Sequence, residues 1–147
     1  MLLDQITTDV GSVSVKEAWQ SLEKNPAAQL VDVRTSAEWQ FVGVPDLTRL
    51  GRSAHLIEWQ SYPEGTIAGD FVTRCTSALQ QVGAGPETDL FFLCRSGARS
   101  LSAARAMVAA GFRRCHNIVE GFEGPLDHQR HRASAGWKVA GLPWVQG

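Results

Sequence analysis

Residues 89–100 read Asp-Leu-Phe-Phe-Leu-Cys-Arg-Ser-Gly-Ala-Arg-Ser. The first five form a short apolar run, which is typical of a buried strand and too short for a core helix. Residues 101–110 are rich in good helix formers, and Gly111 ends that run. We therefore expect a strand, a tight loop of small residues and a helix, with Cys94 at the carboxyl end of the strand.

This position favours a reactive thiolate at Cys94. The first turn of a helix leaves backbone N–H groups unpaired, and its aligned peptide dipoles place roughly +0.5 charge there. Arg95 and Arg99 add two positive charges, and Gly97 lets the backbone fold closely around a bound anion. A free cysteine at the end of a core strand is also commonly a small buried hydrophobic residue. Because an inert thiol has no use for a polar, cationic loop, we interpret Cys94 as reactive.

The composition predicts one globular domain. The chain has 147 residues, 44% of them hydrophobic and 20% charged, which suits a single core. We expect one domain over residues 1–147, with its core at about 8–145. The formal net charge of −1 argues against partners such as nucleic acid or an anionic membrane surface.

The sequence also predicts a cytoplasmic location. No stretch approaches the ~18 apolar residues of a membrane span, and residues 1–9 lack the basic and apolar regions of a signal peptide. The three cysteines, Cys75, Cys94 and Cys115, are few, odd in number and widely spaced. This pattern is typical of a reducing compartment rather than of a disulfide framework.

Helical and strand-like segments alternate along the chain. We expect helices at 15–23, 36–42, 68–82 and 101–110, strands at 29–33, 55–59, 89–93 and 114–119, a loop at 44–52 and a short helix within 136–144. This order predicts an α/β fold with a mainly parallel sheet covered by helices on both faces. Ligands of such sheets bind at the carboxyl ends of the strands, where Cys94 and Arg34 both lie.

Several pieces of the sequence, in this order and spacing, resemble a rhodanese-type sulfurtransferase domain. They are 30–34 (LVDVR), 38–39 (EW), 93–100 (LCRSGARS), 110–112 (AGF), 117–122 (NIVEGF) and 136–144 (GWKVAGLPW). Together they span about residues 28–145. The resemblance implies the rhodanese-like three-layer fold, in which the active loop lies between a strand and a helix of a mainly parallel sheet.

The resemblance also implies an activity. Cys94 would take a sulfane sulfur from a donor such as thiosulfate, carry it as a persulfide, and pass it to cyanide or to a thiol, which includes a thiol of an acceptor protein. The loop would hold the substrate through Arg95, Ser96, Gly97, Ala98, Arg99 and Ser100, with Arg95 and Arg99 binding an oxyanion donor. Asp32, Arg34 and Glu38 would brace the loop. We expect no metal ion and no other cofactor.

Two segments depart from the family pattern. Residues 43–54 replace a shorter and more regular link, and residues 120–135 form an extended insertion before the final tryptophan motif. Because both segments could flank the active loop, the sequence does not identify the donor or the acceptor. It also does not show whether a partner protein docks on the insertion.

Two other functions fit the same architecture. A phosphatase or arsenate reductase needs Cys-x5-Arg, but Ser100 occupies that position here and Arg99 comes one residue earlier. The shorter loop favours a single extra sulfur over a phosphate. A non-catalytic sensor or docking module is the other alternative, although such modules commonly lose the cysteine that this chain has.

Two further groups of residues have simpler explanations. Glu123, Asp127, His128 and His131 could suggest a metal site, but without a cysteine pair a solvated surface is favoured. Cys75 and Cys115 are expected in the core, and either would serve as a resolving thiol only if it lay near Cys94.

Overall fold

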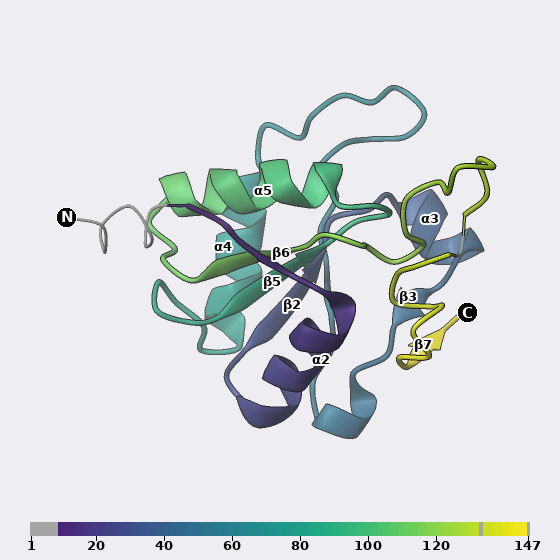
Figure 1. Cartoon of the computed structure of the whole chain (residues 1–147). Coiled ribbons are helices and arrows are strands. Elements are labelled where there is room, and N and C mark those ends of the chain that lie inside the picture. Colours follow the sequence, from purple (N-terminus) through teal and green to yellow (C-terminus); the bar gives the residue numbers. More distant parts are fainter. Residues whose placement is uncertain (1–8, 133, 147) are drawn as a thin grey trace.

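Five parallel strands form the central sheet of the protein, in the order β1-β6-β5-β2-β4 (Figure 1). The structure, a computed structural model, describes residues 9–132 and 134–146; the expectation for residues 1–9 falls almost wholly outside them. The strands are β1 (Gly11–Val13), β2 (Gln29–Asp32), β4 (His55–Leu56), β5 (Leu90–Leu93) and β6 (Cys115–Ile118). The predicted α/β class with a parallel sheet is confirmed. The edge strand β1 was not expected from the sequence.

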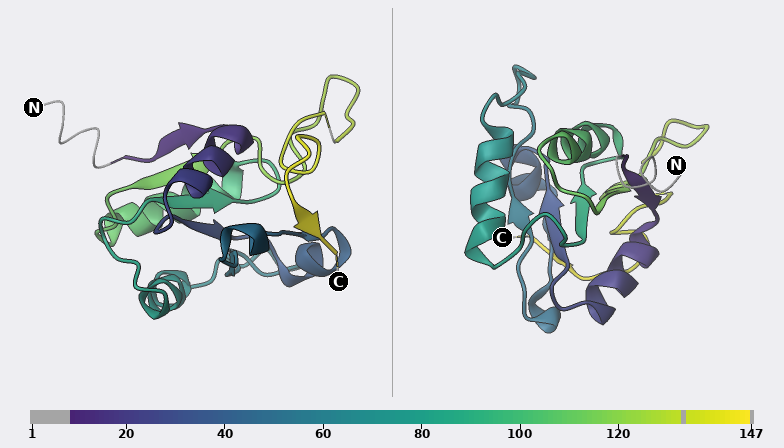
Figure 2. Two further views of the ribbon diagram at one scale, coloured as in Figure 1. Left: turned by 90° about the horizontal axis from the view of Figure 1, so that it is seen from below. Right: turned by 90° about the vertical axis from the view of Figure 1, so that its left-hand side faces the viewer.

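Helices cover both faces of this sheet. They are α2 (Val15–Lys24), α3 (Ser36–Phe41), α4 (Phe71–Gln81) and α5 (Ala98–Ala109), with a 3-10 turn η1 (Thr48–Leu50). Figure 2 shows α2 and α4 on opposite sides of the strands. Reciprocal capping boxes start two of the helices: Ser14 and Glu17 for α2, Thr35 and Glu38 for α3. Within the described residues, no helix is long and apolar enough to cross a membrane.

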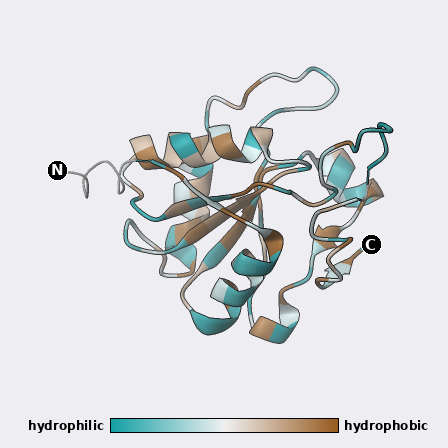
Figure 3. Ribbon diagram, viewed as in Figure 1, coloured by the Kyte–Doolittle hydropathy of each residue, from teal (hydrophilic) through white to brown (hydrophobic). Residues whose placement is uncertain are grey.

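The sheet divides the core into two layers. Successive side chains of a strand point to opposite faces, so Leu30 and Leu93 pack on the α2 side, whereas Val31 and Cys94 pack against α4 and α5. β2 and β5 are buried on both faces, as expected for central strands of a parallel sheet. Figure 3 shows their hydrophobic residues at the centre of the molecule.

Three of the expected elements differ from the structure. The prediction of a short helix within 136–144 is wrong, because turns fill most of this segment and it ends in β7 (Trp144–Val145). Gly136 and Gly141 adopt φ of 107° and 77°, which a right-handed helix does not allow. The predicted loop 44–52 contains β3 (Val44–Pro45), which pairs antiparallel with β7, as well as η1. Strand β4 is also shorter than predicted.

The order of the strands creates a crevice for a site. From β2 the chain continues through α3 to the edge strand β4, whereas from β5 it continues through α5 to β6 on the other side. The loops after β2 and β5 therefore leave the sheet in opposite directions from neighbouring strands. In open parallel sheets, ligands bind at this kind of switch point, and here Arg34 and Cys94 follow the two strands.

Candidate active site

The thiol of Cys94 lies at the amino-terminal end of α5. The Gly97 N–H donates a hydrogen bond to Cys94 Sγ at 3.1 Å, and Ser100 Oγ lies 3.2 Å from the same sulfur. Gly97 is the N-cap of α5, with φ of 104°. Only 1% of Cys94 is exposed. The sulfur is therefore surrounded by a helix terminus and polar donors on one side, although its neighbours also include core residues of the α4 and α5 layer.

The turn that follows β6 sets the shape of the cysteine loop. The Cys94 carbonyl accepts a hydrogen bond from Phe122 N at 2.8 Å, and the Arg95 carbonyl accepts bonds from Glu123 N and Gly124 N at 3.1 Å each. A trans peptide unit points its C=O and its N–H in opposite directions. The N–H groups of Arg95 and Ser96 therefore point away from this turn.

Asn117 connects the loop to the sheet, although the sequence analysis did not select it. Asn117 Nδ2 donates to the Gly97 carbonyl at 3.1 Å, and its Oδ1 lies 2.6 Å from Ser100 Oγ. The single hydroxyl proton of Ser100 thus has two acceptors, Asn117 Oδ1 and Cys94 Sγ. Asn117 is a polar residue within the predicted strand 114–119, but that strand also contains Arg114 and His116, so its polarity did not single it out.

Asp32 and Arg34 form a completely buried ion pair at the end of β2. Arg34 Nη2 lies 2.7 Å from Asp32 Oδ2, Arg34 Nε lies 3.0 Å from Oδ1, and both side chains are 0% exposed. Arg34 also donates to the Gly43 carbonyl at 2.8 Å, and its guanidinium stacks over the Phe122 ring at 4.2 Å. Arg34 therefore supports the same turn that holds the cysteine loop.

Glu38 and Arg99 join α3 to α5. The Arg99 guanidinium donates to both carboxylate oxygens of Glu38, at 2.7 and 2.9 Å. Burial alone would raise the pKa of Glu38. Hydrogen bonds from Arg99 and the Thr35 backbone, with the charges of Arg99 and Arg34, outweigh burial and lower this pKa to about 2. Arg99 is thus held by the Glu38 carboxylate, and its role in binding an oxyanion stays a prediction.

Replacing Glu38 by glutamine tests this ion pair. Because the pKa of Glu38 is lower in the folded state than the ordinary 4.5, the ionised carboxylate adds to the free energy of unfolding at every pH above 4.5. This contribution is lost as the pH falls from 4.5 toward 2. We expect the wild type to be more stable than Glu38→Gln by a constant difference from pH 7 to about 5, and this difference to close in more acid solution. Urea unfolding at several pH values measures it. A difference that widens with acid would contradict the ion pair.

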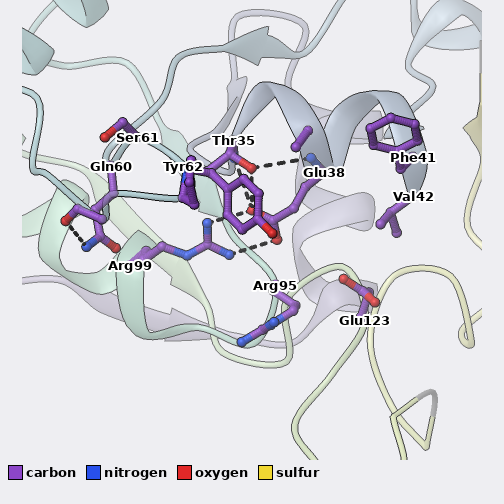
Figure 4. A pocket seen from close by; sticks show the side chains of 13 residues that line it. Thr35, Glu38, Phe41, Val42, Gln60, Ser61, Tyr62, Arg95, Arg99 and Glu123 are labelled. Carbon is purple, nitrogen blue, oxygen red and sulfur yellow. Dashed lines mark hydrogen bonds and ion pairs between the residues drawn. The ribbon is translucent and has the colours of Figure 1, made fainter.

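A cavity of about 600 Å³ opens beside the loop (Figure 4). Its charged lining residues are Glu38, Arg95, Arg99 and Glu123, and its aromatic lining residues are Phe41 and Tyr62. Arg95 is exposed, and Ser96 is half-buried. Ala98 is exposed on the first turn of α5 and does not line the cavity. The sequence analysis did not select Phe41, Tyr62 or Glu123 for this site, because they come from segments that meet only in the fold.

The other two cysteines are suited to the core. Burial, together with the neighbouring Cys115, raises the pKa of the Cys75 thiol to about 12, and burial raises that of Cys115 to about 12 as well. Both thiols therefore stay protonated at neutral pH and are poor nucleophiles. In the part of the chain that the structure describes, no group of three or more His, Cys, Asp or Glu residues is gathered as a metal site would require.

Known proteins are similar to this chain in both sequence and fold. Residues 10–147 match a family model described as the STR4 middle domain. The crystal structure of the M. tuberculosis protein Rv0390 has 44% sequence identity and a TM-score of 0.81, and the match covers 95% of this chain and 99% of that one.

Two curated relatives extend the comparison. An uncharacterized Rickettsia rickettsii protein is 35% identical over 135 residues, which are 92% of this chain and 97% of the relative. Thiosulfate sulfurtransferase 18 from Arabidopsis thaliana is 30% identical over 121 residues, which are 82% of this chain and 81% of the relative.

Proposed function

This chain belongs to the rhodanese-like family, and on that basis we propose that it is a sulfurtransferase that carries a sulfane sulfur on Cys94. The observation that carries the proposal is the hydrogen bond from the Gly97 N–H to Cys94 Sγ at the start of α5. A helix terminus and oriented amides stabilise an anionic sulfur without a metal ion.

The first half-reaction loads the enzyme. The Cys94 thiolate attacks the outer sulfur of a donor such as thiosulfate, a new S–S bond forms, and the bond between that sulfur and the rest of the donor breaks. Sulfite leaves with the electron pair of the broken bond, and the persulfide keeps one negative charge. In this proposal the N–H groups of Arg95 and Ser96 stabilise the added sulfur, and the exposed Arg95 guanidinium receives the leaving anion.

The second half-reaction unloads the enzyme. Cyanide or a thiolate attacks the outer sulfur of the Cys94 persulfide, takes that sulfur and releases the Cys94 thiolate, so no oxidant or reductant is consumed. A thiol of an acceptor protein fits the same chemistry. The proposal includes a cytoplasmic location, which is supported by three cysteines that are all free.

Mass spectrometry of the intact protein tests this function. Incubation with excess thiosulfate or, separately, with inorganic polysulfide is expected to add the mass of one sulfur to the chain, and peptide mapping is expected to locate it on Cys94. Cyanide should then remove the added mass and release thiocyanate. If no donor adds sulfur to Cys94, the proposed function is wrong.

A further inference from the structure

The cavity beside the cysteine loop is larger than a small inorganic anion needs. Its volume of about 600 Å³ lies within the range of roughly 300–1,000 Å³ that is typical of sites for organic ligands. Arg95 and Arg99, from the loop and helix that hold Cys94, form part of its lining. A sulfur donor in this cavity would therefore have an organic body to fill the remaining space.

The charges of the lining do not favour a dianion. The cavity has two guanidinium groups, Arg95 and Arg99, and two carboxylates, Glu38 and Glu123, so its charge is balanced. Arg99 is already bonded to both oxygens of Glu38. The remaining cation is Arg95, and Glu123 stands in the same lining as a like charge that repels anions. One guanidinium matches a single negative charge better than the two charges of thiosulfate.

Aromatic side chains supply the rest of the recognition. Phe41, from α3, is 71% exposed, and Tyr62, from the segment between β4 and α4, is 70% exposed. Figure 4 shows Phe41 and Val42 on one side of the cavity and Tyr62 beside the Glu38–Arg99 pair. These two exposed aromatic rings line the same cavity, and their apolar π faces are surfaces on which a flat organic group would pack.

We propose, on the basis of the sulfurtransferase function above, that the preferred donor is an organic monoanion that carries its sulfane sulfur on a flat apolar body. Thiosulfonates (R–SO₂–S⁻) and persulfides (R–S–S⁻) have this chemistry. The Cys94 thiolate attacks the terminal sulfur, the bond from that sulfur to the R-bearing sulfur breaks, and R–SO₂⁻ or R–S⁻ leaves with the electron pair. The body R lies between Phe41 and Tyr62, and its anionic end lies at Arg95.

Two donors that transfer the same sulfur atom allow the donor preference to be tested independently of the sulfurtransferase function on which it rests. Benzenethiosulfonate and thiosulfate differ in that a phenyl ring replaces one charged oxygen. The rate at which the full chain gains one sulfur on Cys94 is measured at several concentrations of each donor, which gives kcat/KM for loading. The quantity compared among proteins is the ratio of the two kcat/KM values, so that the intrinsic reactivity of the donors cancels.

We expect Phe41→Ala and Tyr62→Ala each to lower kcat/KM for benzenethiosulfonate by about tenfold relative to the value for thiosulfate. Glu123→Gln should raise the value for thiosulfate about threefold and the value for the singly charged aryl donor by less. Val82→Ala, which shortens an exposed apolar side chain outside this cavity, is the matched control and should leave the ratio as in the wild type.

The outcomes have distinct meanings. If sulfur is loaded on Cys94 but the ratio stays within about twofold of wild type in the Phe41, Tyr62 and Glu123 variants, the proposed donor class is overturned and the sulfurtransferase function remains. If neither donor adds sulfur to Cys94 of the wild type, both proposals fail together.

Discussion

Replacing Cys94 by serine is expected to reduce sulfur transfer by at least about 10³-fold, because a hydroxyl at neutral pH is a far weaker nucleophile than a thiolate and forms no persulfide. The fold should survive. Serine is close to cysteine in size, and its oxygen can accept the Gly97 N–H bond that Sγ accepts now, so the free energy of unfolding should change by about 1 kcal/mol or less. Thiocyanate formation and thermal unfolding measure the two quantities.

Cys75→Ala is the matched control for this variant. Cys75 is also buried on the α4 and α5 side of the sheet, but burial and Cys115 raise its pKa to about 12, so it stays a neutral thiol. We expect this control to retain sulfur loading despite some loss of stability. If Cys94→Ser still gains sulfur and Cys75→Ala does not, Cys75 rather than Cys94 carries the sulfur and the assignment of Cys94 is wrong.

Gly97→Ala is expected to have the largest effect on stability among single substitutions of the loop, and to slow transfer as well. Gly97 has φ of 104°, and a Cβ atom at this position would lie 2.5 Å from the Val119 carbonyl oxygen. That oxygen belongs to the backbone directly after β6, which cannot move without disturbing the sheet. We expect a loss of about 2–4 kcal/mol in the free energy of unfolding. A displacement of the loop by about 1 Å should slow transfer by roughly 100-fold.

Gly111→Ala separates the backbone strain from the contact. Gly111 has φ of 105°, almost the same as Gly97, but no atom lies within 4 Å of the position of its Cβ. This variant should lose only about 1 kcal/mol, the cost of a left-handed backbone for alanine, and should transfer sulfur at the wild-type rate. Equal losses in the two variants would show that the contact with Val119 has no role.

The regular elements could be predicted because their causes are local. The apolar run before Cys94, the helix formers after it and the capping residues Ser14 and Thr35 each lie within a few residues of the element that they define. The tail was predicted wrongly because Trp137 is completely buried and its Nε1 donates to the Pro143 carbonyl at 2.7 Å. The burial of Trp137 in the core on the α2 side, together with this bond within the segment, decides the conformation of residues 136–144.

The candidate site was predictable only in part for the same reason. The cysteine loop is continuous in sequence, so Cys94, Gly97 and the flanking arginines could be selected together. The pairing of Arg99 with Glu38 joins two segments 61 residues apart, so it could not be predicted from the loop sequence itself. The aromatic residues of the cavity carry no sequence motif, since exposed Phe and Tyr side chains become informative only when the fold shows what they surround.

The alternation of side chains along β5 determines which layer of the molecule receives the sulfur. Leu93 belongs to the α2 layer and Cys94 to the α4 and α5 layer, while the register of β5 is held by β2 on one side and β6 on the other. Deleting or inserting one residue between Leu90 and Cys94 would turn the thiol to the opposite layer, away from the start of α5. Insertions or deletions in this strand therefore keep the thiol in place only when they involve an even number of residues. The surface segments that line the cavity have no such constraint, so their length can vary with the substrate.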